Sequence, residues 1–240
     1  MRTIVLMMLA ALAQAQPPAA RVEYEVVSVK PGDPNDPSSS GRSTPGTMEM
    51  RNATLNTLVR GAYNLNEFQL VGGPKWVNSA RFHVDAKFPA GTPGDQTRLM
   101  MQNMLADRFK LKVHRETKTL SEYALVVAKG GAKLEAASED DKKRTRSSQG
   151  PRQIKTWGAP VSNFARMLIS AVGAPVLDQT GLDGLYNFIL EFAPLEGARP
   201  EDDKLPSIFA AVQQLGLKLE PIKGPVEVLV IDSAEMPAAN

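Results

Sequence analysis

Cysteine is absent from the 240 residues, and histidine occurs only at His83 and His114. Without cysteine the chain can form no disulfide bond, use no thiol nucleophile and carry no lipid on an N-terminal cysteine. Neither histidine belongs to a His-x-x-x-His or His-Glu-x-x-His pattern, so the sequence indicates no zinc site and no catalytic triad. The Gly-x-Ser-x-Gly, Walker and dinucleotide-binding motifs are missing too. We therefore expect a protein that is not an enzyme and that uses no metal and no cofactor.

An excess of charge of one sign is also missing. The chain has 28 Lys and Arg against 26 Asp and Glu, which gives a net charge of +2. Much of the basic surplus lies in one run, Lys142 to Arg146, without interleaved aromatic residues. Because a nucleic-acid-binding surface needs many phosphate contacts, this distribution argues against a nucleic-acid partner.

The only marked apolar run is at the N-terminus, where the residues have the pattern of a secretory signal. Arg2 precedes the apolar residues 4–12, and the small residues Ala13 and Ala15 follow them. A run of about nine apolar residues is too short to cross a hydrocarbon layer of about 30 Å. We expect residues 1–15 to be a signal peptide that is cleaved between Ala15 and Gln16. The exported chain would then be periplasmic or extracellular, with no membrane span.

The rest of the chain alternates between strand and helix patterns. Four segments have the apolar and polar alternation that is typical of strands: 24–30, 48–52, 68–71 and 82–88. Thr54 can cap a helix, and four residues would form its buried face: Leu55, Leu58, Val59 and Ala62. A longer helical pattern follows Pro93, with five residues in register: Leu99, Met100, Asn103, Met104 and Phe109. The proline-rich residues 31–45 predict an exposed loop. This order of elements predicts an α+β fold.

The second half of the chain repeats the pattern of the first half. Residues 159–166 match residues 53–60 at an offset of 106 (159 − 53), and residues 186–192 match residues 82–88 at 104 (192 − 88). We therefore predict two tandem β-α-β-β-α-β-β units, at 21–131 and 151–236. Each unit would have a mixed or antiparallel sheet packed by two helices.

The expected ends of both units are hairpins, and a linker is expected between the units. Residues 111–117 and 123–128 predict the first hairpin, and Gly224-Pro225 predicts the turn of the second. Residues 132–150 are charged and polar without apolar periodicity, which predicts a solvated linker.

Several short motifs are similar to those of a known family. They include Tyr24 to Pro31, Gly72 to Trp76, Leu105 to Leu111, Asp178 to Leu182 and Gly216 to Asp232. Together they resemble the soil-associated family of exported bacterial proteins, a family of the Acidobacteria type whose function is unknown. That resemblance implies an extracytoplasmic sensing or interaction role. Residues 208–232 also resemble the short N-terminal domain of secretins and TonB-dependent receptors, which is a periplasmic docking unit.

Three residues are candidates for an interaction site: Trp76, Trp157 and Asp178. Tryptophan is enriched in binding hot spots, although both indoles could instead pack over a domain edge. Asp178 and Asp183 could act as a carboxylate pair of a hydrolase, or they could be ordinary turn residues beside Gly181. The features together indicate an exported module that binds or senses an envelope protein or a peptide. A small-molecule binder, with its ligand in the groove between the units, and a cryptic hydrolase are the alternatives.

Overall fold

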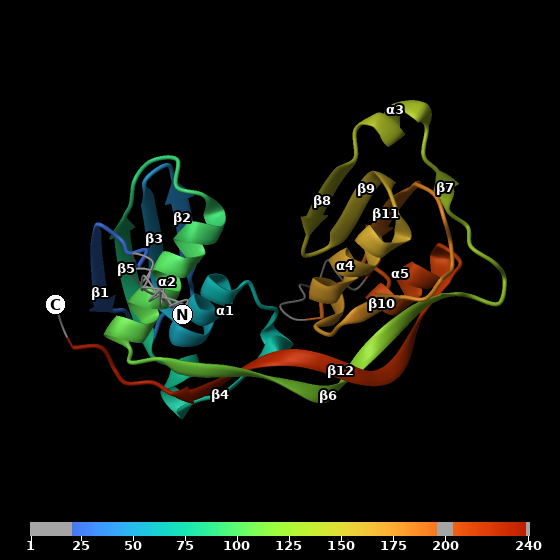
Figure 1. The fold of residues 1–240 in the computed structure, drawn as a ribbon. Helices are drawn as coiled ribbons and strands as arrows, with labels where there is room; N and C mark the ends of the chain where they lie inside the picture. Colours follow the sequence, from blue (N-terminus) through green and yellow to red (C-terminus); the bar gives the residue numbers. More distant parts are fainter. Residues whose placement is uncertain (1–20, 196–203, 239–240) are drawn as a thin grey trace, which may run out of the picture.

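The computed structural model describes residues 21–195 and 204–238. The expected signal peptide, residues 1–15, lies outside the described residues. Two lobes, each a β-sheet covered by helices, lie side by side along a long two-stranded ribbon (Figure 1). The predicted α+β class is confirmed.

The first lobe is built on an antiparallel sheet with the strand order β1-β5-β3-β2. Its strands are β1 (Val26–Pro31), β2 (Ser40–Thr44), β3 (Thr47–Thr54) and β5 (Arg81–Lys87). Buried residues alternate along β5, with Phe82, Val84 and Ala86 facing the core. Helices α1 (Leu55–Tyr63) and α2 (Gly94–Arg108) pack against this face, because a one-sided apolar sheet must be covered.

The sequence predicts α1 correctly. The backbone N–H of Thr57 donates to Thr54 Oγ1 at 3.1 Å at the N-terminus, and Asn64 ends the helix in the left-handed region at φ 52°. The predicted buried face is confirmed, since the four residues that form it are all 0% exposed: Leu55, Leu58, Val59 and Ala62. The prediction for α2 is wrong at Leu99, which is 46% exposed. Met100 and Met104, from the same predicted pattern, are buried, and Met101 and Leu105 complete the core-facing stripe.

The second lobe has a similar sheet, with the strand order β7-β11-β9-β8. Its strands are β7 (Glu135–Ala136), β8 (Arg146–Gly150), β9 (Gln153–Ala159) and β11 (Tyr186–Glu191). Helices α4 (Val161–Val172) and α5 (Ile208–Gln214) pack on it. Residues 132–150 are therefore not an unstructured linker, because they form β7, the short helix α3 (Glu139–Lys143) and β8. These strands are held by pairing with β9 and β11 rather than by apolar burial.

A continuous ribbon replaces the two predicted hairpins. Strands β6 (Lys112–Val127) and β12 (Leu217–Ser233) pair antiparallel along almost their whole lengths. The hairpin predictions are wrong because Gly224 and Pro225 lie within β12, opposite Leu120 and Thr119. Proline is tolerated in a strand where its nitrogen faces an open edge, and the other neighbour of β12 is β4 (Leu70–Gly72), which pairs only from Leu229 to Ile231.

Each lobe receives part of its core from the other half of the chain. Leu229 and Ile231, near the end of β12, belong to the first core. Leu125, near the end of β6, belongs to the second core. Strand β10 (Val176–Asp178) pairs parallel with this part of β6. The 3-10 turns η1 (Glu67–Gln69) and η2 (Lys75–Asn78) flank β4. Within the described ranges, none of the helices is long and apolar enough to span a membrane.

Corresponding elements of the two lobes share an unusual backbone detail. Helices α1 and α4 begin 106 residues apart (161 − 55), and each follows a β-bulge. The residues at these bulges, Asn52 and Gly158, are also 106 apart (158 − 52) and have φ of 54° and 63°. The N–H of Asn52 donates to His83 Nδ1 at 3.2 Å, and the N–H of Gly158 donates to Asn187 Oδ1 at 3.1 Å. The two lobes therefore form the same bulge with different side chains.

Candidate functional site

The structure places the two tryptophans in different lobes. Trp76, in η2, is partly buried against the first core, with its ring edge-to-face with Phe82 at a centroid distance of 6.3 Å. Trp157 lies on β9, and the guanidinium of Arg146 stacks over its ring at 5.3 Å. Both indoles are thus engaged by neighbours of their own lobe. The structure does not bring them together into one site.

Asp178 ends β10 and is exposed to solvent. Its Oδ1 accepts hydrogen bonds from the Thr180 N–H at 3.0 Å and from Thr180 Oγ1 at 2.7 Å. This is the local pattern of an aspartate that starts a turn. Asp183 is exposed as well, and its carbonyl oxygen accepts from the Tyr186 hydroxyl at 2.8 Å. Both carboxylates lie in solvated turns, so this geometry gives no support to the hydrolase alternative.

Each of the two histidines contacts a residue of its own surroundings through a ring nitrogen. His83 accepts the N–H of the Asn52 bulge, as described above. His114, on β6, lies 2.7 Å from Asp232 Oδ1 through Nδ1, and both side chains are substantially exposed. Among the described residues there is no cluster of side chains suited to hold a metal ion.

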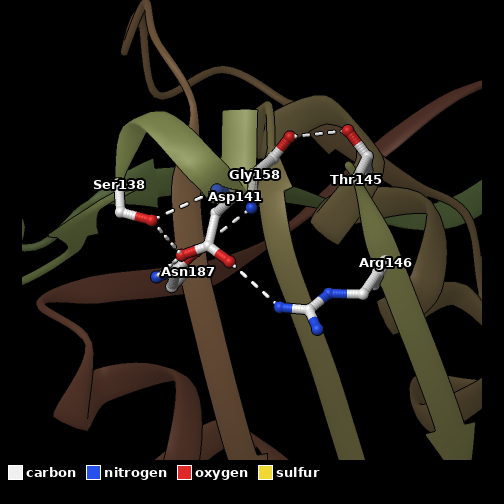
Figure 2. Close-up of polar contacts among 6 residues, drawn as sticks. All are labelled: Ser138, Asp141, Thr145, Arg146, Gly158 and Asn187. Atoms are coloured by element: carbon white, nitrogen blue, oxygen red, sulfur yellow. Dashed lines mark hydrogen bonds and ion pairs between the residues drawn. The ribbon is translucent and has the colours of Figure 1, made fainter. Parts of the chain in front are cut away.

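A polar cluster around Asp141 fixes α3 to the second sheet (Figure 2). Asp141 Oδ2 accepts from Ser138 Oγ at 2.7 Å and from Asn187 Nδ2 at 3.2 Å, and Oδ1 accepts from Arg146 at 3.0 Å. The hydrogen bond from Ser138 first, and then those from Asn187 and Arg146, hold the pKa of Asp141 below its usual value. Because every one of these partners also stabilises α3 or its attachment, we interpret the cluster as structural.

In the first lobe, the bulge residue equivalent to Gly158 is Asn52. Its own side chain holds the neighbouring loop, where the second lobe has the helix α3. Asn52 is buried, and its Oδ1 accepts from the Asp33 N–H at 2.9 Å. Its Nδ2 donates to the carbonyl oxygens of Asp36 at 2.7 Å and Ser38 at 3.2 Å. Asn52 thereby holds the proline-rich loop that leads into β2. A hydrogen bond from Ser38 keeps the pKa of Asp36, in the same loop, below its usual value.

The first lobe has an apolar groove between β2 and the two helices, which we call the β2 groove. It has a volume of about 300 Å³. Its lining comes from β2, β3, α1, α2 and Phe88: Gly41, Arg42, Ser43, Met48, Met50, Thr57, Leu58, Gly61, Phe88, Thr97, Arg98 and Met101. Three methionines form much of the apolar surface, and methionine adapts its shape to different partners. Tyr24 lies beside the groove, with its hydroxyl 3.4 Å from the Thr97 carbonyl oxygen, and burial raises its pKa to about 12.

Two glycines keep the β2 groove open. A Cβ atom at Gly61, on α1, would meet nothing within 4 Å. A Cβ atom at Gly41, on β2, would lie 2.8 Å from the Met50 sulfur, so the glycine leaves room for that methionine. Glycine inside a helix is less stable than alanine by about 1 kcal/mol, and here it leaves the mouth of the groove without a side chain.

In the second lobe a side chain spans the equivalent gap between the edge strand and the helix. Strands β2 and β8 begin 106 residues apart (146 − 40), so Gln149 corresponds to Ser43 and Met167 to Gly61. The amide of Gln149 donates to the Met167 carbonyl oxygen at 2.8 Å and also contacts Ser170 Oγ. The edge strand β8 is therefore tied to α4 by a side chain. The corresponding serine on β2 is too short to make this bridge.

The backbone of β2 is free along one side. Strand β2 is the end of its sheet and pairs only with β3 among the described residues. All five of its residues are exposed. An unpaired strand edge can accept a further strand, and the β2 groove lies directly beside this edge. The two features could serve one extended ligand.

A larger cavity of about 640 Å³ lies between η1 and the second lobe. It is lined by Glu67 and Phe68 from the first half and by residues of β8, α4 and the segment after β11, ending at Leu195. This is the place where the small-molecule alternative expects a ligand. Two of its polar side chains are already engaged, since Gln149 is bonded to α4 and Glu67 lies 3.3 Å from Arg60.

The sequence analysis missed the β2 groove, because it predicts an exposed loop over residues 31–45, where the structure has β2. The available signals were Gly61 within a helical pattern and the cluster of Met48 and Met50 on one strand.

Comparison with known proteins gives a family but no activity. No curated protein and no solved structure matches the chain. A family model described as "Protein of unknown function (DUF3738)" matches residues 56–234, which include the helices of both lobes, both strands of the ribbon and part of the β2 groove. Since this match covers well over half of the chain, the protein belongs to the DUF3738 family.

Proposed function

We propose that the protein is an exported, non-catalytic binding protein whose first lobe takes an extended peptide along β2, with an apolar side chain in the β2 groove. The observation that carries the proposal is the free edge of β2 beside an apolar groove, whereas Gln149 bridges the equivalent gap in the second lobe. Main-chain hydrogen bonds to an edge strand supply affinity, and pockets for alternate side chains supply specificity.

The geometry of the sheet supports this mode of binding. Gly41 pairs with Met50, and Ser43 pairs with Met48, so these four residues point to the helix-covered face. A strand added to β2 would place every second side chain on that same face, next to the groove. A volume of about 300 Å³ accommodates one large apolar side chain. Burying a Leu or Met side chain contributes about 1.5–3 kcal/mol.

Export is part of the proposal and rests on the N-terminal residues. The charged start, the apolar run and the small residues before Gln16 support a cleaved signal. We also propose, as part of the same hypothesis, that the chain is related to the exported soil-associated proteins and to docking units of the secretin type, which it resembles. Expression with the native N-terminus, followed by cell fractionation and N-terminal sequencing, tests it. An intact Met1 in the cytoplasmic fraction would contradict export.

Duplication of one unit also belongs to the proposal. The matched bulges at Asn52 and Gly158, and the common offset of 106 for α1 and α4, support a repeat. In this view the first copy has a groove between β2 and α1, while in the second copy Gln149 bridges β8 to the Met167 carbonyl oxygen of α4.

The test of peptide binding is selection from a random-peptide phage library on the immobilised protein, residues 16–240. Gly61→Trp should fill the groove and abolish enrichment, because the new side chain enters open space without displacing the core. Gly130→Trp is the matched control, since a Cβ atom at Gly130 also meets nothing within 4 Å and lies outside the groove. It should enrich the same peptides as the unchanged protein.

Hydrogen exchange then reports where a selected peptide binds. Slower exchange of the backbone amides of residues 40–44 is expected when the peptide adds to the edge of β2. Peptides that bind Gly61→Trp as well as the unchanged protein, or protection confined to the second lobe, would contradict the proposal.

A further inference from the structure

We infer that the peptide taken by the β2 groove carries a carboxylate next to its apolar anchor, and that Arg98 binds this carboxylate. The inference rests on the proposed function and specifies its ligand. It starts from the charges of the groove. The lining contains two arginines, Arg42 and Arg98, and no aspartate or glutamate. The groove is therefore apolar inside, and its lining has no negative charge that would repel a carboxylate.

Other arginines of the first lobe have partners, whereas these two do not. Arg51 lies 2.6 Å from Asp85, Arg60 lies 3.3 Å from Glu67, and Arg21 lies 3.0 Å from Asp107. Within residues 21–195 and 204–238, Arg42 and Arg98 form neither an ion pair nor a side-chain hydrogen bond. Their guanidinium groups are open to an external anion.

Of the two, Arg98 is the better placed. It precedes Met101 by three residues on α2, and side chains at this spacing are neighbours on one helix face. Met101 is buried and lines the groove, so Arg98 lies beside the apolar floor. Arg42 alternates with Gly41 and Ser43 along β2. Since those two residues point to the helix-covered face, the side chain of Arg42 points to the opposite face.

A peptide can supply the carboxylate in two ways. In an extended chain, residues two apart point to the same face and lie about 7 Å from each other, so an Asp or Glu two residues from the anchor could reach Arg98. A free C-terminal carboxylate directly after the anchor could do the same. A guanidinium pairs with either group through two parallel hydrogen bonds.

The experiment is a set of NMR titrations of the isotope-labelled protein, residues 16–240. The probes are acetyl-Thr-Val-Thr-Leu-Thr-Glu-Thr-amide, its Gln analogue, and acetyl-Thr-Val-Thr-Leu with a free or an amidated C-terminus. Shifts of the amides of residues 40–44 and 57–61 report binding at the groove. We expect one of the two carboxylate peptides to bind about fivefold more tightly than its neutral analogue, as is typical of a partly exposed ion pair. The pair of peptides that shows the difference identifies the source of the carboxylate.

Arg98→Gln should remove this fivefold difference and leave the binding of the neutral peptides unchanged. Arg42→Gln removes the same charge from the opposite face and should keep most of the difference. Salt at about 0.5 M should reduce the preference, because it screens exposed charges. Equal affinity for charged and neutral peptides, or equal effects of the two substitutions, would overturn the inference while leaving the peptide groove in place. Absence of binding by all four peptides would overturn both proposals.

Discussion

Asn52 makes the sharpest prediction about stability, because one buried side chain combines an unusual backbone angle with three hydrogen bonds. Its amide holds Asp33, Asp36 and Ser38 at 2.9, 2.7 and 3.2 Å, and a typical hydrogen bond contributes about 1 kcal/mol net. Its φ of 54° costs a residue such as alanine about 1 kcal/mol more than it costs asparagine or glycine. Asn52→Ala should therefore lower the free energy of unfolding by about 3–4 kcal/mol, and Asn52→Gly by about 2–3 kcal/mol.

Urea unfolding followed by circular dichroism measures both values, and hydrogen exchange of residues 32–39 shows whether the loop is released. Asn56→Ala is the matched control, since Asn56 is partly exposed on α1 and makes a single bond of 2.9 Å to Asn78. It should change stability by less than about 0.5 kcal/mol. A loss of under about 0.5 kcal/mol in Asn52→Ala would refute the role of the amide. Equal losses in the alanine and glycine variants would refute the contribution of the backbone angle.

Three further predictions concern residues at equivalent or neighbouring positions. Gly158→Ala should displace α3 and cost about 2–3 kcal/mol, because the new Cβ would lie 2.1 Å from the Asp141 carbonyl oxygen at a φ of 63°; unchanged urea unfolding would contradict this. Gly61→Ala should instead raise the unfolding free energy by about 0.5–1 kcal/mol, since it adds a helix-forming residue in open space, and thermal unfolding measures the gain. The lowered pKa of Asp141 stabilises the fold above its ordinary value of 3.8, and this contribution is lost as the pH falls through the lowered pKa. The protection factors of the amides of residues 138–146, which correct for the intrinsic pH dependence of exchange, should accordingly fall in acid in the unchanged protein. Asp141→Asn should show lower protection factors already at neutral pH and a weaker dependence on acid.

The elements that the sequence predicts correctly are those whose stability comes from their own apolar pattern. Helix α1 has a capping threonine and a complete buried face, so local rules suffice. Strands β2 and β8 have the sequences SGRST and RSSQG, with no large apolar residue. They are strands because a neighbouring strand pairs with them, and composition does not reveal a partner.

The ribbon shows how long-range pairing overrides a local turn signal. Gly224-Pro225 has the residues of a turn, yet β12 continues through it because β6 pairs on one side and the other side is open at this point. The candidate site was missed for a related reason. A groove depends on which strand lies beside which helix, and neither Gly61 within a helix pattern nor the pair Met48 and Met50 reveals that arrangement.

The exchange of strands between the lobes fixes the order in which the chain can complete its two cores during synthesis. The first lobe begins at the N-terminus, but Leu229 and Ile231 close its core, and β4 can pair only after they have been made. The ribosome therefore finishes nearly the whole chain before the first-made residues have their final neighbours. Until β12 has been made, the apolar residues of the first lobe that pack on Leu229 and Ile231 have no complete core to join.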